Sequence, residues 1–107
     1  MPTIKKLGKP KKTNAASVRR AERQAIYNTT RWHSLRDVKR MNDPLCERCL
    51  AKKPSIVRPA TEIHHVVSFM SVEDMTERKA LAYDYENLMS LCHECHEAMH
   101  GGRPHDD

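Results

Sequence analysis

The sequence predicts a small α+β domain, in which N-terminal helices precede two short strands and a final helix. Apolar residues recur at helical spacing over residues 18–38, and β-branched residues gather over residues 61–67. Only 38% of the 107 residues are hydrophobic and 5% are aromatic, so few side chains can fill a core. A domain of this composition needs a staple, and two Cys-x-x-Cys pairs can supply one.

Two helices are predicted before the first cysteine. Ser17 is the predicted N-cap of the first helix. The apolar face of this helix is predicted to hold Val18, Ala21, Ala25 and Ile26. The second helix is predicted from about Arg31 to Met41, and Pro44 marks its end. Its inner face is predicted to carry Trp32, Leu35 and Val38.

The second half of the chain contains both predicted strands. Residues 60–67 and 87–91 are the two segments, because β-branched and other apolar side chains are concentrated there. Between them, Ser71 is the predicted N-cap of a short helix that runs to about Tyr83, and Asp74 completes a capping box.

The four cysteines form two closely spaced pairs, Cys46-x-x-Cys49 and Cys92-x-x-Cys95. Four thiolates at this spacing can surround a zinc ion tetrahedrally. Two disulfides would instead imply an oxidising compartment, and no apolar run typical of a signal peptide follows the N-terminal lysines. A redox Cys-x-x-Cys motif would need a βαβ context, which the predicted elements lack. The sequence therefore predicts a structural zinc site.

Charge is distributed unevenly along the chain. Up to Arg58 there are 16 Lys and Arg against 4 Asp and Glu, whereas from Pro59 onward there are 3 against 10. A basic half is typical of proteins that bind nucleic acid. The alternative is a solvated basic tail that only keeps the protein soluble. The predicted phosphate contacts on the outer face of the second helix are Arg31, Arg36, Lys39 and Arg40.

We expect three parts in the chain. They are a disordered basic arm at residues 1–16, a folded domain at residues 17–102 and a flexible tail at residues 103–107. No stretch is long and apolar enough to cross a membrane. We expect a cytoplasmic protein with no membrane partner.

Strand and helix geometry allows several of the histidines to lie close together. The last helix is predicted over Glu94–His100, and each residue advances a helix by about 100°, so His96 and His100 turn toward a common surface beside the cysteines. His64 and His65 are adjacent on a strand, so their side chains point to opposite faces of a regular pleat. If this strand packs on the helix, three or four imidazoles can converge on a transition metal.

Such side chains suit the hydrolysis of a phosphodiester. A neutral histidine near its ordinary pKa of about 6.5 can take a proton from the attacking water. A divalent cation can offset charge on the phosphoryl oxygens and on the leaving oxygen. Asn87 has both hydrogen-bond donors and acceptors, so it can tie a loop and orient the base.

The order of these residues resembles the zinc-containing HNH endonucleases. The resemblance covers residues 31–100 and is carried by Ile63-His64-His65-Val66, by Asn87-Leu88-Met89-Ser90-Leu91 and by the cysteine pairs. It implies a ββα-metal (His-Me finger) fold, in which two strands and a helix hold one catalytic metal. It also implies that His65 is the general base, that Asn87 positions this base and its loop, and that His96 is a metal ligand.

The sequence departs from the family at two positions beside the expected base. His64 stands where many members carry Asp as a metal ligand, and nitrogen in place of oxygen shifts the expected metal from Mg²⁺ toward Mn²⁺, Ni²⁺ or Zn²⁺. No proline follows His65, where relatives often have one. His100 is either a third ligand or a partner of the ligands.

The resemblance implies a metal-dependent endonuclease that acts on DNA in a bacterial host or a phage-infected cell. Small HNH proteins of this kind resemble those that accompany the packaging motor, the terminase, of bacteriophages, so the chain is either active alone or only within such a machine. The alternative is a non-catalytic, zinc-stapled DNA-binding module. That alternative explains the cysteines and the basic half, but it leaves the ordered histidines without a role.

Overall fold

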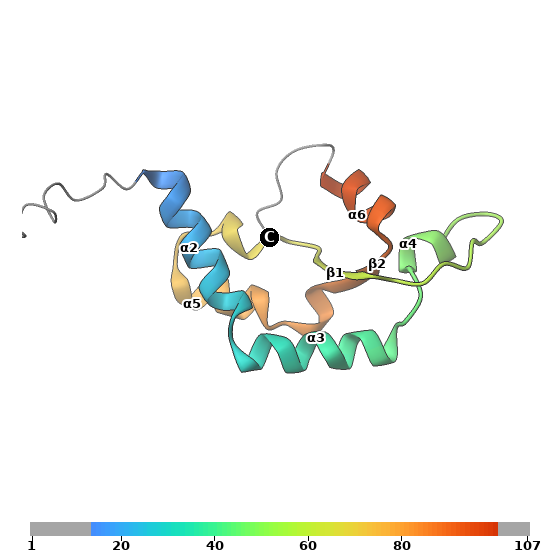
Figure 1. Cartoon of the computed structure of the whole chain (residues 1–107), viewed down its shortest axis with the longest axis horizontal. Coiled ribbons are helices and arrows are strands. Elements are labelled where there is room, and N and C mark those ends of the chain that lie inside the picture. The colour runs from blue at the N-terminus through green and yellow to red at the C-terminus, as the bar shows by residue number, and fades with distance from the viewer. Residues whose placement is uncertain (1–13, 101–107) are drawn as a thin grey trace, which may run out of the picture.

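The structure, a computed structural model, describes residues 14–100 of the chain (Figure 1). The helices are α2 (Ala15–Tyr27), α3 (Thr30–Asn42), α4 (Glu47–Leu50), α5 (Met75–Ala82) and α6 (His93–His100), with 3-10 turns η1 (Phe69–Ser71) and η2 (Tyr85–Asn87). The strands are β1 (Glu62–His65) and β2 (Leu88–Leu91). The predicted combination of helices with a small sheet is confirmed. Most of the predicted basic arm and the predicted C-terminal tail lie outside the described residues.

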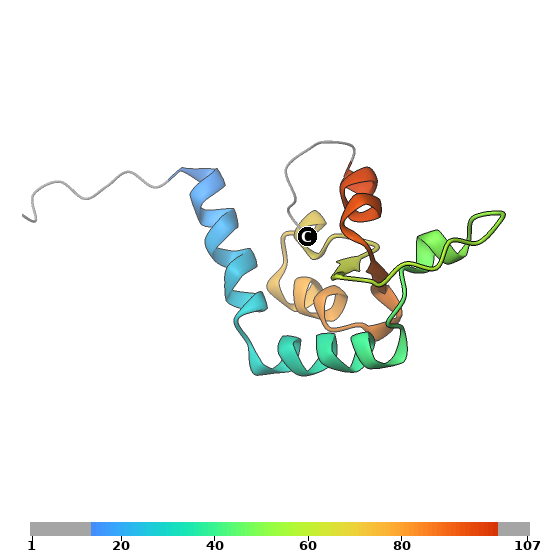
Figure 2. The ribbon, with the colours of Figure 1, turned by 45° about the vertical axis from the view of Figure 1, so that its right-hand side comes forward.

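A two-stranded antiparallel hairpin lies at the centre of the fold. Glu62 of β1 is opposite Leu91 of β2, and His65 is opposite Leu88. Helix α3 covers one face of this hairpin and α6 covers the other, as Figures 1 and 2 show from two directions. Because side chains alternate along a strand, the two faces receive different halves of β1.

Helix α2 begins earlier than predicted. Asn14, not Ser17, is its N-cap, and the Asn14 side chain accepts a hydrogen bond of 2.8 Å from the Ser17 backbone N–H. An Asn oxygen at the N-cap satisfies one of the free amide groups of the first turn.

The face that α2 buries also differs from the predicted one. Val18, Ala21 and Ala25 are exposed, and only Ile26 of the predicted apolar face is buried. The attached face instead carries Arg19, which donates to the Met70 carbonyl, Glu22, which pairs with Arg78, and Ile26. These three residues have the i, i+3, i+7 spacing of a single helix face, one residue out of phase with the prediction.

Helix α3 is rotated in the same sense. Trp32 is buried as predicted, but Val38 is 47% exposed, whereas Lys39 is only 5% exposed. Trp32 and Lys39 are seven residues apart and therefore lie on one side of the helix, toward the hairpin. The prediction that Val38 faces the core and Lys39 faces solvent is wrong.

Lys39 is held in the interior by two carboxylates. Its Nζ lies 2.7 Å from Asp43 and 3.0 Å from Glu47, and 5.3 Å from the ring centre of Tyr85. Burial lowers the pKa of Lys39, but the hydrogen bonds to Asp43 and Glu47 outweigh this effect and hold the pKa above its ordinary value. The buried ammonium group ties α3 to α4, so Lys39 is not placed to make the predicted DNA contact.

Helix α5 also begins at a different residue. Its N-cap is Asp74, whose side chain accepts from the Glu77 backbone N–H, while Ser71 ends the preceding turn η1. The predicted cap at Ser71 is therefore wrong. The later start places Arg78 and Ala82 on the buried side of α5, where the Arg78 guanidinium bonds to Glu22, Glu73 and the Val72 carbonyl.

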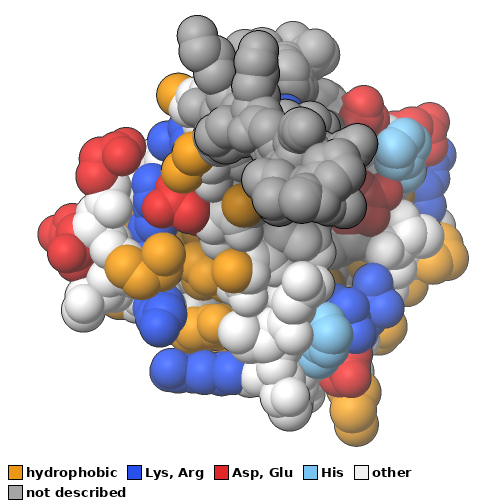
Figure 3. All heavy atoms as spheres, turned by 60° about the vertical axis from the view of Figure 1, so that its left-hand side comes forward, with side chains coloured by type: hydrophobic (Ala, Val, Ile, Leu, Met, Phe, Trp, Pro, Cys, Tyr) orange, Lys and Arg blue, Asp and Glu red, His pale blue; other side chains and the backbone are white. Residues whose placement is uncertain are grey.

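The surface around α2 has mixed character. Figure 3 shows apolar, acidic and basic side chains interspersed on this side of the molecule. Over residues 14–100, none of the helices combines the length and apolar character needed to span a bilayer.

We expect Lys39→Ala to lower the free energy of unfolding by about 1–3 kcal/mol, because it leaves two carboxylates without their cation. The matched Arg36→Ala removes only a local contact with Asp37 and should cost at most about 0.5 kcal/mol. Urea denaturation near neutral pH measures both losses, and equal losses would contradict the role assigned to Lys39. Because the folded pKa of Lys39 is raised, its contribution is complete below pH 10.5 and declines as the pH rises through the folded pKa.

Candidate metal sites

The four cysteines form one buried cluster, here called the cysteine clamp. Cys46 and Cys49 come from the start of α4, and Cys92 and Cys95 from the start of α6. The Cys49 sulfur lies 3.9 Å from that of Cys92 and 3.6 Å from that of Cys95. Four sulfurs about 2.3 Å from a tetrahedral zinc ion would be about 3.8 Å apart, so the clamp fits zinc. All four thiols are free, which excludes the disulfide alternative in this structure.

The surroundings of the clamp give its thiols different pKa values. Burial raises the pKa of the Cys92 thiol, but hydrogen bonds from the Cys95 backbone, the neighbouring thiols and Arg58 outweigh burial and lower this pKa to about 6. For Cys95, burial and the adjacent sulfurs raise the pKa to about 12. The lowered pKa of Cys92 favours its thiolate, which is the form of cysteine that binds metal, and a bound cation would stabilise the thiolates of the other cysteines as well.

A second cluster contains three histidines, here called the histidine cluster. His64 of β1 faces His96 and His100 of α6, with ring centres 5.1 and 5.2 Å away. The Nε2 atoms of His96 and His100 are 3.1 Å apart, and the ligand atoms of all three lie within 4.8 Å of one another. Nitrogens about 2.0–2.1 Å from one metal ion would be about 3.4 Å apart, so the cluster fits a transition metal with positions left for other ligands.

The two clusters share one helix. Cys95 and His96 are consecutive in α6, and His100 follows His96 by four residues, so the helix points its cysteine toward the clamp and both histidines toward β1. The structure brings together His64 and His96, which were predicted to share a metal, and it adds His100, which the sequence left open between two roles.

Glu62 supports the histidine cluster and was missed at the sequence level. It lies two residues before His64, on the same face of β1, and its carboxylate accepts hydrogen bonds from Nδ1 of His96 and, at 2.8 Å, from Nδ1 of His93. Burial raises the pKa of Glu62, but these two hydrogen bonds outweigh burial and hold the pKa below its ordinary value. A carboxylate on Nδ1 fixes the ring so that Nε2 can bind a metal.

His93 is part of this arrangement, although it lies outside the cluster itself. Its side chain is 70% exposed, and the hydrogen bond to Glu62 raises its pKa. Glu62 lies two residues before His64, and this spacing alone could have placed both side chains on one face of the strand. Its partners His93 and His96 are more than 30 residues away, so no local pattern indicated these hydrogen bonds.

His65 lies on the opposite face of the hairpin, away from the histidine cluster. It is 1% exposed, and its ring stacks on Trp32 with 4.8 Å between ring centres. Tyr27 and Phe69 complete the walls around it, and its Nε2 lies 3.1 Å from the Ala82 carbonyl oxygen. The register continues regularly through His65, so the strand has no bulge there to turn the ring toward α6.

Asn87 fixes the loop that follows β1. Its side-chain amide donates to the carbonyls of Val67 (2.9 Å) and Leu81 (3.1 Å), and its side-chain oxygen accepts from the Val67 N–H at 2.9 Å. Its backbone carbonyl accepts from the Val66 N–H. Asn87 thus ties together the loop directly after His65, the end of α5 and the start of β2.

The model of the HNH endonuclease family matches residues 46–102, which is more than half of the chain. The chain belongs to the HNH endonuclease family. The match begins at Cys46 and spans the clamp, the histidine cluster and Asn87, while α2 and α3 precede it. No curated protein and no solved structure matches the chain. An HNH domain indicates a nuclease or a DNA-binding role.

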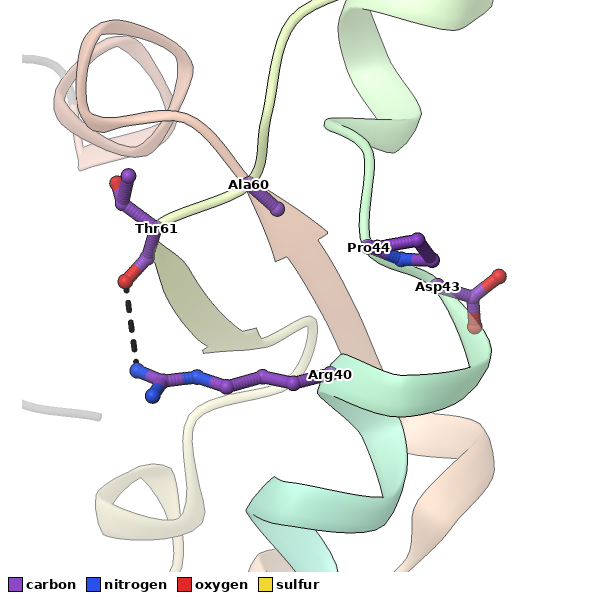
Figure 4. A pocket seen from close by; sticks show the side chains of 5 residues that line it. All are labelled: Arg40, Asp43, Pro44, Ala60 and Thr61. Atoms are coloured by element: carbon purple, nitrogen blue, oxygen red, sulfur yellow. Dashed lines mark hydrogen bonds between the residues drawn. The ribbon is translucent and has the colours of Figure 1, made fainter.

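The predicted DNA contacts on α3 lie on the face of the hairpin away from the histidine cluster. The Arg31 guanidinium sits 4.4 Å from the ring centre of Tyr83, and Arg36 pairs with Asp37 at 3.3 Å. Arg40 borders a pocket of about 330 Å³ lined also by Asp43, Pro44, Ala60 and Thr61. Figure 4 shows its guanidinium reaching across this pocket to the Thr61 carbonyl, at 3.4 Å.

We expect Cys46→Ser to abolish stoichiometric zinc binding and to lower the melting temperature sharply, because structural zinc contributes folding free energy. Metal analysis and thermal melting of the purified variant measure these effects. Ser55→Ala is the control, because Ser55 is exposed and lies outside the four cysteines, and we expect it to retain the zinc. Retention of zinc and of the parent melting temperature in Cys46→Ser would contradict the zinc assignment.

For the histidine cluster, we expect His100→Ala to weaken Ni²⁺ binding to the zinc-loaded protein by at least about tenfold, because one of three ligands is lost. His33→Ala removes an exposed imidazole from α3 and should leave the affinity unchanged. Calorimetric titration with Ni²⁺ compares the two variants, and identical affinities would show that His100 is no ligand.

Proposed function

We propose that this chain is a metal-dependent endonuclease that hydrolyses DNA phosphodiester bonds. The observation that carries the proposal is the histidine cluster, in which three imidazoles from β1 and α6 converge inside a domain of the HNH family. A stable fold does not require three buried or half-buried imidazoles in contact, and a carboxylate that orients one of them is typical of metal centres.

In this proposal, β1, β2 and α6 form the ββα-metal unit, and His64, His96 and His100 hold the catalytic cation. An all-nitrogen ligand set favours Mn²⁺, Ni²⁺ or Zn²⁺ over Mg²⁺. When bound, such a cation supplies electrostatic stabilisation of the phosphoryl and leaving oxygens and acidifies a bound water. Glu62 keeps Nδ1 of His96 protonated, which leaves Nε2 of that ring for the metal.

His65 is the proposed general base, in keeping with its place in the family pattern. A carbonyl oxygen can only accept a hydrogen bond, so Nε2 of His65 carries the proton toward Ala82 and Nδ1 is the basic nitrogen of the neutral ring. Nδ1 is buried, so the ring has to leave the wall formed by Trp32 and Phe69 before it can reach a water molecule. Asn87 is proposed to hold the adjoining loop in place during this step.

Metal-dependent cleavage of supercoiled plasmid tests the proposal. We expect nicking with at least one of Mn²⁺, Ni²⁺, Zn²⁺ or Mg²⁺, and loss of nicking in His96→Ala with DNA binding retained. His33→Ala is the matched control for a lost imidazole. Absence of cleavage by the parent protein with every metal, together with normal DNA binding, would favour the non-catalytic DNA-binding module.

The role of His65 has a separate test, because a buried side chain can matter for folding alone. We expect His65→Gln to abolish nicking while zinc content, melting temperature and Ni²⁺ affinity stay close to those of the parent. Nicking that survives in a folded His65→Gln variant would reject the base and leave His65 as a packing residue against Trp32.

We further propose that the protein acts with a bacteriophage terminase, on the basis of its resemblance to HNH proteins that accompany packaging motors. Co-purification with a large ATPase subunit from infected cells would support this partner. Nicking activity that is unchanged by that subunit, and failure to bind it, would count against it.

A further inference from the structure

We propose that residues 51–57, here called the clamp loop, form the surface that grips the DNA backbone, with Lys52 and Lys53 on phosphates and Val57 against the deoxyribose edge of the groove. This inference rests on the proposed function, since it assigns where the polyanionic substrate is held. The clamp loop projects beyond α4 at one end of the molecule (Figures 1 and 2).

The cysteine clamp gives the loop a fixed shape. The backbone N–H groups of Lys52 and Ile56 both donate to the Cys49 carbonyl, at 3.2 and 3.0 Å, and the Ser55 hydroxyl donates to the Leu50 carbonyl at 2.8 Å. At the return end of the loop, the Cys46 N–H donates to the Arg58 carbonyl at 2.8 Å. A surface that is ordered before its partner arrives loses less conformational entropy on binding.

All the charged side chains in the clamp loop and directly beside it are basic. Residues 48–61 contain four basic side chains and no acidic one. Two of the four are used internally, because Arg58 pairs with Glu94 and Arg48 donates to the Cys95 carbonyl. Lys52 and Lys53 are exposed and form no ion pair within residues 14–100, so their charges are available to a polyanion.

Apolar side chains accompany the lysines on the clamp loop. Val57 is 73% exposed and Ile56 is 37% exposed, and Leu50, the last residue of α4 directly before the loop, is 39% exposed. A protein partner could also cover such a patch. The two unpaired lysines and the absence of acidic residues favour DNA, whose sugars offer an apolar edge between rows of phosphates.

The position of the loop relative to the histidine cluster supports the same partner. Cys49, which anchors the loop, lies 3.6 Å from Cys95 through its sulfur, and His96 is the next residue of α6. The cysteine clamp therefore links the clamp loop, through Cys49, to the helix that carries His96. The arginines of α3 lie across the hairpin and already contact Tyr83, Asp37 and Thr61.

The test compares two double variants that remove the same charge. Binding of a fluorescent duplex is measured by anisotropy over a range of salt concentrations, without added catalytic metal. We expect Lys52→Gln with Lys53→Gln to weaken binding on the order of tenfold at 0.1 M salt and to lower the salt slope by about 2, because each phosphate contact releases about one counterion. Arg31→Gln with Arg36→Gln removes the same charge from the α3 surface that the sequence predicted to contact DNA, and we expect it to lower the slope less than the clamp-loop variant does.

Val57→Ser tests the apolar contact. It should weaken binding several-fold without changing the salt slope, because no phosphate contact is lost. Zinc content and melting temperature of each variant establish that the clamp is intact.

Two results would overturn the inference. One is a salt slope that falls in the α3 double variant but not in the clamp-loop variant, and the other is unchanged binding by both clamp-loop variants. These results differ from failure of the proposed function, in which the parent protein does not nick DNA with any of the metals. If the parent nicks plasmid while the clamp-loop variants bind like the parent, only this inference fails.

Discussion

Four thiols from two distant parts of the chain meet at the cysteine clamp, and this contact holds the other elements in place. The clamp joins the start of α4 to the start of α6 across 42 intervening residues, and its sulfurs lie at the separations that a tetrahedral zinc ion requires. Because α6 carries both Cys95 and His96, any loss of order at the clamp would move the histidine cluster as well. The binding energy of zinc would therefore fix the geometry of a second metal centre one residue away.

The hairpin divides two kinds of chemistry between its faces. One face of β1 carries Glu62 and His64 toward α6, where a carboxylate and three imidazoles surround a candidate cation position. The other face carries His65 into an aromatic wall formed by Trp32, Tyr27 and Phe69. The side chains of His64 and His65 thus lie on opposite faces of β1 because of the pleat. His65, the proposed base, has to move before it can act together with the histidine cluster.

Helices α2 and α3 lie outside the span matched by the family, yet they form part of the surroundings of His65, the proposed base. Trp32 and Tyr27 pack against His65. Several basic residues of these helices form contacts within the protein. Lys39 is fixed by Asp43 and Glu47, and Arg19 bonds to the Met70 carbonyl. Fewer basic side chains are therefore available to DNA than the net charge suggests. The proposed DNA contacts lie on the clamp loop, and not on α3, because Lys52 and Lys53 are exposed there without an ion pair among the described residues.

The features that were predictable from the amino-acid sequence are those whose signals are local. The Cys-x-x-Cys spacing, the position of both strands and the i, i+4 relation of His96 and His100 all depend on a few neighbouring residues, and each predicted the structure well. Which face of each helix is buried depends instead on the packing of distant segments. Lys39 replaces Val38 on the inner face because Glu47 and Tyr85 lie there, and the partners of Glu62 are more than 30 residues away. Such contacts depend on where distant segments pack, and local spacing carries no information about that packing.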